Sequence, residues 1–386
     1  MSRQPGRQSG RQSGRRPRAR KARGASAVGR RFEVEVGPVA HGGHFVARVP
    51  AGADGEQRVV FVRHALPGER VVLEVTDGSE GDKFWRADAV EVLTPSPDRV
   101  TPPCRYAGPG LCGGCDLQHV DLAAQRRLKA DVVREQLRRV ARLDVDVVVE
   151  AVPGDDAGLH WRTRQRYVSL PDGGRGMRKH RSHEVVEVDE CLLEAPAGPS
   201  YDVHGRAFEV ADGGFWQVHP GAPTALVDAV TGALRPQPGE SVLDLYAGVG
   251  LFSRFLLEAV GPVGRVAAVE GDPAASALSA KNCPGLLAQP GDVAEVLAGG
   301  LPAEWDTADL VVLDPPRAGA KRPVVEQVVA RSPRAVAYVA CDPGALARDV
   351  AIFAEHGYHL VSLRAFDLFP MTHHVECVAL LEEALP

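Results

Sequence analysis

Short alternating segments in the first part of the chain give way to longer apolar runs in the last part. Between Phe32 and about Leu93, segments such as Val59–Val62 and Glu69–Val75 alternate and are separated by Gly and Pro turns. Short strands at such spacing predict a small β-barrel. From about Pro220 strand-length apolar runs alternate with loops and helical segments, which predicts an α/β domain with a doubly wound, Rossmann-like parallel sheet.

The middle of the chain is mixed. Apolar positions recur at helical spacing over Ala123–Arg142, and residues 145–215 alternate in a way that predicts a mostly antiparallel insert. We therefore expect a mixed α+β central part. The predicted domains are a basic tail (1–31), a β-barrel (32–93), a central domain (94–219) and an α/β domain (220–386).

The net charge of −5 conceals an asymmetry. Residues 1–31 hold eleven Arg or Lys and no acid, which leaves 34 basic against 50 acidic residues in the remainder. Such a polar stretch is expected to be disordered, and it reads equally as a nucleic-acid arm or as a solubilising tail. No apolar run approaches the ~18–20 residues of a membrane span, and the N-terminus lacks a signal-peptide core, so we expect a soluble, cytoplasmic protein.

Three apolar runs of the α/β domain end in polar or reactive residues. Asp244 precedes a glycine loop that contains Gly248, Asp314 opens an Asp-Pro-Pro-Arg sequence, and Cys341 follows Val339-Ala340. The carboxyl ends of parallel strands meet at one edge of a sheet, where open α/β sheets bind ligands. These side chains are therefore expected to share a site.

The glycine loop predicts a nucleotide-type cofactor. Glu270 ends the next strand about twenty residues on, where an acid accepts ribose hydroxyls, and Asp292 follows the third strand, placed to accept from an adenine amino group. The third glycine of a dinucleotide site is missing, so S-adenosylmethionine fits better. For Asp244 a helix-loop cap is the alternative.

Cys341 is the candidate nucleophile and Glu376 the candidate base. Arg317 stands where amino-group methyltransferases carry an aromatic residue, which favours a carbon target. Thiolate addition at carbon 6 of uracil makes carbon 5 nucleophilic, and a carboxylate can then remove the carbon 5 proton. Hydrogen-bond donors and the following helix are expected to lower the thiol pKa. The plain alternatives are a buried structural thiol and a solvent-facing Glu.

Three motifs resemble those of the RNA (uracil-5-)-methyltransferases, which modify 23S ribosomal and transfer RNA. They are Leu313-Asp-Pro-Pro-Arg-Ala-Gly, Val339-Ala-Cys-Asp-Pro and His373-His-Val-Glu-Cys. The resemblance covers roughly residues 32–386, and residues 32–93 resemble the TRAM domain, an OB-like barrel that binds RNA. It implies that Cys341 is the nucleophile and Glu376 the proton acceptor. The cofactor contacts that it implies are Gln217, Tyr246, Glu270 and Asp314.

Two positions depart from the family pattern, because many members have Asn where Leu251 and His219 stand. The resemblance also implies an RNA partner, with 23S ribosomal RNA expected ahead of transfer RNA. Nothing in the sequence demands a protein partner or more than a monomer.

Four cysteines suggest a metal site: Cys104, Cys112, Cys115 and the distant Cys191. Four thiolates suit either tetrahedral zinc or an iron–sulfur cluster. Many bacterial members of the family carry a four-cysteine [4Fe–4S] site with a loop two residues shorter, so the resemblance implies such a cluster ahead of zinc.

Alternation over Trp161–Tyr167 predicts a strand that places Arg162, Arg164 and Arg166 on one face, suited to RNA phosphates or simply to solvent. Two other functions stay open. One is an enzyme of the same fold that methylates another RNA atom, and the other is a catalytically silent RNA-binding or assembly protein.

Overall fold

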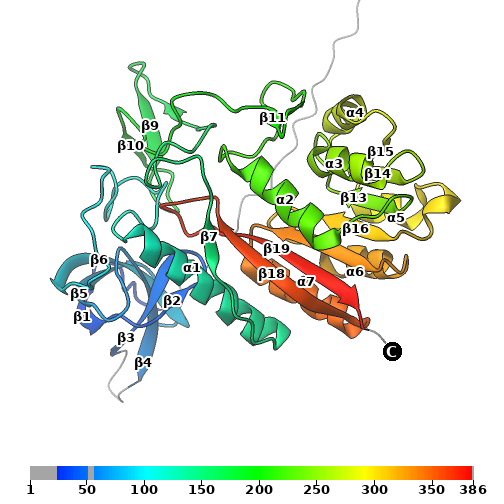
Figure 1. Cartoon of the computed structure of the whole chain (residues 1–386). Coiled ribbons are helices and arrows are strands. Elements are labelled where there is room, and N and C mark those ends of the chain that lie inside the picture. Colours follow the sequence, from blue (N-terminus) through cyan, green and yellow to red (C-terminus); the bar gives the residue numbers. More distant parts are fainter. Residues whose placement is uncertain (1–23, 51–55, 385–386) are drawn as a thin grey trace, which may run out of the picture.

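The computed structural model describes residues 24–50 and 56–384, and shows a small β-domain at one end and a large α/β domain at the other (Figure 1). Helix α1 (Leu122–Gln136) lies between them. The α/β fold of the last part and the β-rich fold of the first part are confirmed. None of the helices in the described residues has the length and apolar character that a membrane crossing requires.

The N-terminal domain is a six-stranded sheet that closes on itself. Its order is β1-β5-β6-β4-β3-β2. Strand β1 pairs with β5 at one end of this order, and β2 pairs with β3 at the other end. Because β1 and β2 follow each other in the sequence, the segment from Arg31 to Ala40 joins the two ends and closes the barrel. The strands are β1 (Arg31–Glu35), β2 (Val39–Ala40), β3 (His44–Pro50), β4 (Gln57–Arg63), β5 (Arg70–Asp77) and β6 (Phe84–Thr94).

The predicted basic tail lies mostly outside the described residues. Its last part does not extend into solvent as expected, because Ala27 is fully buried in the barrel core and its N–H donates to the carbonyl of Gly78. The β-domain thus begins before Phe32.

The central part contains one long helix and several very short strands. Helix α1 is capped by Asp121 and continues into a π-turn (Leu137–Ala141), so the predicted helix is confirmed. The short strands are β7 (Val149–Ala151), β8 (Val168–Ser169), β9 (Arg175–Arg178), β10 (Val185–Glu187), β11 (Asp202–Val203) and β12 (Arg206–Ala207).

Two expectations for this part are wrong. Strand β7 is not part of an antiparallel insert, since it joins the large sheet, parallel to its neighbour at residues 365–367. Trp161–Tyr167 is not a strand either, because only Arg162 makes a bridge, to Glu194. Both segments pair with residues far away in the sequence, and the alternation within a segment does not reveal such partners.

The large sheet has the order β15-β14-β13-β16-β17-β19-β18-β7. The first five are parallel, and β19 and β18 add an antiparallel pair. Its strands are β13 (Ser241–Leu245), β14 (Arg265–Glu270), β15 (Leu287–Pro290), β16 (Leu310–Leu313), β17 (Ala335–Ala340), β18 (Tyr358–Asp367) and β19 (Glu376–Glu383). The chain reverses its direction of winding at β13, where a doubly wound sheet opens a crevice.

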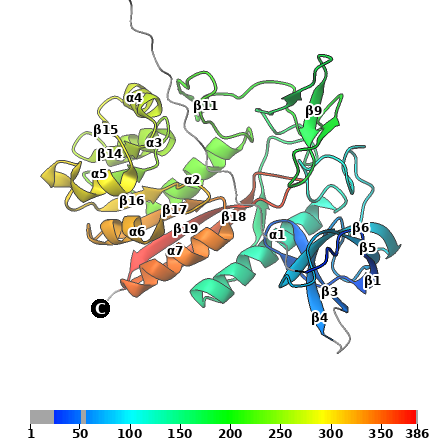
Figure 2. The same ribbon diagram turned by 180° about the vertical axis from the view of Figure 1, so that it is seen from behind.

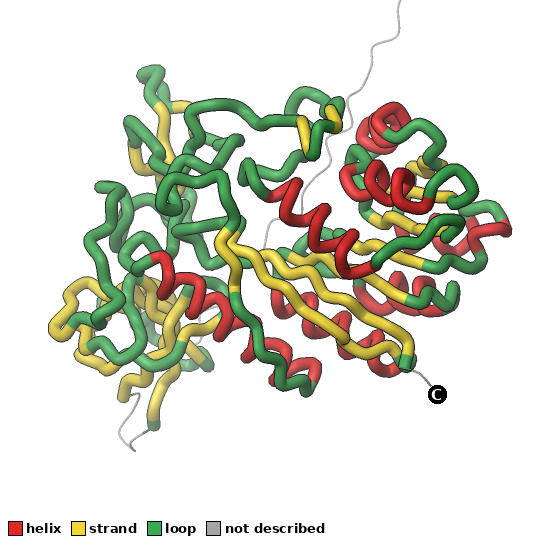
Figure 3. The backbone as a smooth tube through the Cα atoms, viewed as in Figure 1, coloured by secondary structure: helices red, strands yellow, loops and turns green. Residues whose placement is uncertain are grey.

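Helices cover both faces of this sheet (Figures 1 and 3), and Figure 2 shows α6 and α7 on the face opposite α2. The helices are α2 (Ala222–Leu234), α3 (Leu251–Val260), α4 (Pro273–Asn282), α5 (Val293–Gly299), α6 (Lys321–Val329) and α7 (Pro343–Glu355), with a 3₁₀ turn at Ala303–Trp305.

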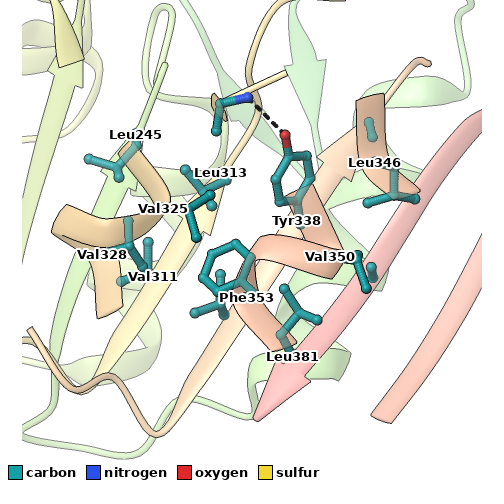
Figure 4. Close-up of a cluster of buried hydrophobic side chains, with 14 of the residues drawn as sticks. Leu245, Val311, Leu313, Val325, Val328, Tyr338, Leu346, Val350, Phe353 and Leu381 are labelled. Carbon is teal, nitrogen blue, oxygen red and sulfur yellow. Dashed lines mark hydrogen bonds between the residues drawn. The ribbon is translucent and has the colours of Figure 1, made fainter. Parts of the chain in front are cut away.

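Alternation along each strand fills two separate cores. Val311 and Leu313 pack against Val325 of α6 and Phe353 of α7 (Figure 4), whereas Val312 belongs to the core beneath α2 and α3. Strands buried on both faces read as continuous apolar runs, which explains why the sequence pattern predicted them. The result is a sheet whose central strands are buried on both faces.

Candidate active site

A cavity of about 940 Å³ opens at the carboxyl edge of the parallel strands. Its wall combines the ends of β13, β14, β16 and β17 with residues of the central part and with the β18–β19 connection. Seven of the residues predicted for the site line it: Gln217, Tyr246, Gly248, Glu270, Asp314, Cys341 and Glu376.

Strand register brings Cys341 and Glu376 together. In the antiparallel pair β17–β19, Ala340 is the partner of Cys377, so one step further Cys341 faces Glu376. Residues directly opposite each other in such a pair have Cβ atoms roughly 4.5–5.5 Å apart and on the same face. A thiol and a carboxyl that are thirty-five positions apart in sequence thus reach one point of the cavity.

Burial and like charge favour the neutral forms of these groups. Burial and the nearby Glu376 carboxyl raise the pKa of the Cys341 thiol to about 12, although the charge of Arg317 acts in the opposite direction. Burial and Asp314 also raise the pKa of Glu376 well above its usual range, and burial raises that of Asp314 to about 7. From the sequence we expected a lowered pKa for the Cys341 thiol. The structure shows a raised one, so this expectation is wrong.

Arg317 and His374 belong to the cavity wall although the sequence did not single them out as site residues. Burial lowers the pKa of His374 to about 3, so its ring is neutral and can accept a hydrogen bond. Nη2 of Arg317 lies 3.2 Å from its Nε2. The sequence used Arg317 only to argue against an amino-group target, but its place directly after Asp-Pro-Pro at the sheet edge could have marked it as a site residue.

The glycine loop lies beside Glu270, as predicted. One carboxylate oxygen of Glu270 accepts from the N–H of Gly248 at 2.8 Å, and the other accepts from the N–H of Asp272. The loop is tightly packed, since a Cβ at Gly250 would lie 2.8 Å from Sγ of Cys283. Gly248 instead lines the cavity, and a Cβ there would meet nothing within 4 Å, so a ligand can approach the backbone of the loop at this position.

Asp244 and Asp292 do not line the cavity. Asp244 is fully buried, and its Oδ2 accepts from the N–H and hydroxyl of Ser253 on α3, so the structure shows the alternative role of a cap. Asp292 caps α5 by accepting from the N–H of Ala294.

Leu251 and His219 are the two positions that depart from the family pattern, and only Leu251 lies next to the cavity. Leu251 lines a small pocket next to the cavity together with Gln217 and Tyr246. His219 is buried and stacks on Trp161, away from the cavity wall.

The three arginines of the predicted stripe line the cavity in spite of the missing strand. Arg162 lies over the ring of Trp161, and Nη1 of Arg164 donates to the carbonyl of Gly214. Arg166 is exposed. Phe215, with 64% of its surface exposed, lies on the same wall. Cations next to an exposed aromatic ring suit a nucleic acid.

The four cysteines also come together. Cys104, Cys112, Cys115 and Cys191 line one small cavity, and the last three accept N–H···S contacts from Gly114, Gln118 and Gln165. In the described part of the chain, however, no group of three or more His, Cys, Asp or Glu is arranged to hold a metal ion.

Comparisons with known proteins agree with this geometry. The family model described as tRNA (Uracil-5-)-methyltransferase matches residues 303–384, and that of the TRAM domain matches residues 25–90. An uncharacterised RNA methyltransferase of Streptomyces avermitilis is 43% identical, over 92% of this chain and 99% of its own. The 23S rRNA (uracil(1939)-C(5))-methyltransferase of Shewanella sp. (strain MR-4) is 30% identical, over 88% of this chain and 95% of its own.

The chain belongs to the RNA (uracil-5-)-methyltransferase family. The crystal structure of Pyrococcus abyssi tRNA (uracil-54, C5)-methyltransferase, in complex with S-adenosyl-L-homocysteine, has the same fold as this methyltransferase. The TM-score is 0.61 at 19% identity, and the match covers 90% of this chain and 99% of that one. The predicted TRAM domain and enzyme class are confirmed.

Proposed function

We propose that this methyltransferase transfers the methyl group of S-adenosylmethionine to carbon 5 of a uridine in structured RNA, with 23S ribosomal RNA as the preferred substrate. The single observation that carries the proposal is the register that sets Cys341 opposite Glu376 inside a cavity with the glycine loop. The 23S preference rests on the names of relatives such as that of Shewanella sp..

The proposed chemistry begins with sulfur. The thiolate of Cys341 adds to carbon 6, and the electron pair of the 5,6 double bond moves to carbon 5 and the carbonyl oxygen at carbon 4. Carbon 5 then forms a bond to the methyl group as the methyl–sulfur bond of the sulfonium breaks. Glu376 takes the proton from carbon 5 in its carboxylate form, which the charge of Arg317 favours, the double bond re-forms, and the thiolate leaves.

The charges around the cavity explain when the thiol ionises. Because Cys341, Glu376 and Asp314 all favour neutral forms in the protein by itself, a positive charge is needed to stabilise a thiolate. Arg317 supplies one, and the sulfonium of the methyl donor supplies a second until the methyl group is transferred. The thiolate is thus favoured when the methyl donor is bound beside Arg317.

Gln217, Tyr246, Gly248 and Glu270 form the wall that we assign to the methyl donor. Glu270 is the proposed acceptor for ribose hydroxyls, since each of its oxygens accepts one backbone N–H and has a further lone pair. Arg162, Arg164 and Arg166 are the proposed phosphate contacts, and a uridine reaches Cys341 only after it leaves the base stack.

Trapping with 5-fluorouridine RNA tests the proposal. With fluorine at carbon 5 there is no proton for Glu376 to remove, so the methylated covalent complex cannot break down. It should accumulate with the unchanged enzyme and disappear in Cys341→Ala. In Glu376→Gln the complex should accumulate on ordinary RNA. A persistent adduct in Cys341→Ala would mean that another nucleophile acts.

Mapping 5-methyluridine in ribosomal and transfer RNA from cells with and without the gene identifies the substrate.

We also propose that the four cysteines hold a [4Fe–4S] cluster with a structural role. They converge on one cavity from two distant segments, and N–H groups point at three sulfurs, as around iron–sulfur clusters. Burial raises the pKa of Cys115 to about 12, so a bound cation is needed to share the charge of the thiolates.

Anaerobic purification tests the cluster. The protein should be brown and contain iron and sulfide, and Cys191→Ser should lose both. Cys283→Ser is the matched control, because that buried cysteine lies beside the glycine loop and should leave the colour unchanged. Colourless protein with one zinc per chain would overturn the assignment.

A further inference from the structure

The β2–β3 turn of the barrel (His41, Gly42 and Gly43) reaches the α/β domain. Nε2 of His41 lies 3.2 Å from Oδ2 of Asp342. Asp342 directly follows Cys341, and its other carboxylate oxygen caps α7 by accepting from the N–H of Ala345 at 2.8 Å. One barrel side chain therefore restrains the residue that joins the proposed nucleophile to its helix.

The other end of the turn lies against the proposed base segment. Gly43 has a φ of +75°, and a Cβ built there would lie 3.0 Å from side-chain atoms of both Asp116 and His373. Those two residues are bonded to each other, since Oδ2 of Asp116 lies 2.6 Å from Nδ1 of His373 and accepts from its N–H at 3.2 Å. His373 comes three residues before Glu376.

A third barrel residue holds the same pair. Arg63 of β4 is buried, and its Nη2 lies 3.7 Å from Oδ1 of Asp116. The barrel thus touches the α/β edge on both sides of the Cys341–Glu376 pair, one residue after the nucleophile and three residues before the base.

We infer that the β2–β3 turn is a positioning element of the active site, which holds the ends of β17 and β19 at their working separation, and that His41 is a positioning residue that acts through Asp342. The inference rests on the proposed function, because it assigns work to the Cys341–Glu376 pair. It gives the TRAM domain a part in methyl transfer itself, in addition to any contact with RNA.

The test compares adduct formation with RNA affinity. Ribosomal and transfer RNA transcribed with 5-fluorouridine are mixed with S-adenosylmethionine and enzyme, and the rate of adduct formation at saturating RNA is measured beside the RNA dissociation constant. His41→Ala should slow adduct formation by about tenfold, since small misplacements of reacting groups are costly. RNA affinity should change by less than about twofold. His41→Gln should recover most of the rate, because its amide N–H can donate to Asp342.

Two glycine variants provide an independent comparison. Gly43→Ala and Gly68→Ala place a side chain at a positive φ in turns of the same barrel, but only the Cβ at residue 43 meets other atoms, since nothing lies within 4 Å at residue 68. Both variants carry the backbone strain. Gly43→Ala should slow adduct formation by about tenfold and Gly68→Ala by less than about twofold. The exposed His359, on the far part of β18, is the control for loss of a histidine.

The outcomes separate the two proposals. Adduct formation at the normal rate in both His41→Ala and Gly43→Ala would overturn the positioning role alone. So would a loss of RNA affinity equal to the loss of rate, which would make the turn an RNA contact. Absence of any adduct with the unchanged enzyme, or its persistence in Cys341→Ala, would overturn the proposed function and the positioning role together.

Discussion

At the scale of single residues, the candidate active site places two acids and a thiol, whose pKa values burial raises, beside one cation. Arg317 is the cation, and neutral His374 holds it by accepting its hydrogen bond. The sequence placed Cys341, Glu376 and Asp314 at the sheet edge, but it suggested a lowered thiol pKa. Only the packed structure shows that Glu376 lies opposite the thiol and acts against its ionisation.

The first prediction concerns pH and Arg317. The Cys341 pKa is raised to about 12, so the thiolate fraction, and with it the rate of adduct formation, should rise with pH from 6 to 9. Arg317→Gln removes the charge that lowers this pKa, so the rate at pH 8 should fall by about tenfold for each unit of further rise. The rate of adduct formation is measured by trapping with 5-fluorouridine RNA, with the reaction stopped at set times, at several pH values across this range.

Arg322→Gln is the matched control, because Arg322 is an exposed arginine of the same loop–helix segment that pairs with Glu355 outside the cavity. An identical pH profile for Arg317→Gln and the unchanged enzyme would remove Arg317 from thiolate stabilisation.

At the scale of elements, hydrogen bonds between strands and helices fix the loops that carry the site. The buried Tyr338 of β17 donates from its hydroxyl to Asp349 of α7 at 2.6 Å and accepts from the N–H of Ala320, next to α6. Ala320 comes shortly after the Asp-Pro-Pro-Arg loop. One phenol thus joins the helices that follow Asp314 and Cys341.

The second prediction follows from this junction. Tyr338→Phe leaves the buried Ala320 N–H without its acceptor and removes one donor from the Asp349 carboxylate, which keeps Lys321 and Arg348 as partners. This should lower the free energy of unfolding by about 1–3 kcal/mol. Tyr201→Phe should change it by less than about 0.5 kcal/mol, because Tyr201 is 39% exposed and packs its ring against Trp216. Urea denaturation of the two variants provides the measurement, and equal stabilities would show that the Tyr338 hydroxyl is not needed.

Elements differed in how well their sequence revealed them. Strands β13, β16 and β17 are buried on both faces and were predicted from continuous apolar runs, and α1 was predicted from its periodicity. Strand β7 has only three residues, and Trp161–Tyr167 alternates without forming a strand. In both cases the outcome depends on partners far along the chain, which local sequence does not encode.

At the scale of the whole molecule, the barrel, the central part and the α/β domain meet at the sheet edge beside the cavity, and the barrel reaches this edge through His41 and Arg63. Asp116 follows Cys115 and bonds to His373, so the cysteine loop is tied to the segment that carries Glu376. Arg162, Arg164 and Arg166 come from the central part and face the same cavity. All three parts therefore contact the edge of the sheet that carries Cys341 and Glu376.

The third prediction concerns RNA binding by this surface. Arg166 is exposed on the cavity wall, so Arg166→Ala should weaken RNA binding and lower the slope of log affinity against log salt by about one. Arg206→Ala should leave the slope unchanged, since Arg206 pairs with Glu258 outside the cavity. Filter binding between low and moderate salt measures both, and equal slopes would show that Arg166 contacts no phosphate.

The sequence by itself determined the α/β and TRAM-like folds, the family, and the residues that meet at the sheet edge, because apolar runs and strand-end motifs are local properties. Tertiary structure decided the rest: which residues face each other across β17 and β19, which acids act as caps, and which charges oppose thiolate formation. Register, burial and electrostatics depend on distances between segments far apart in the chain, and those distances exist only once the chain has packed.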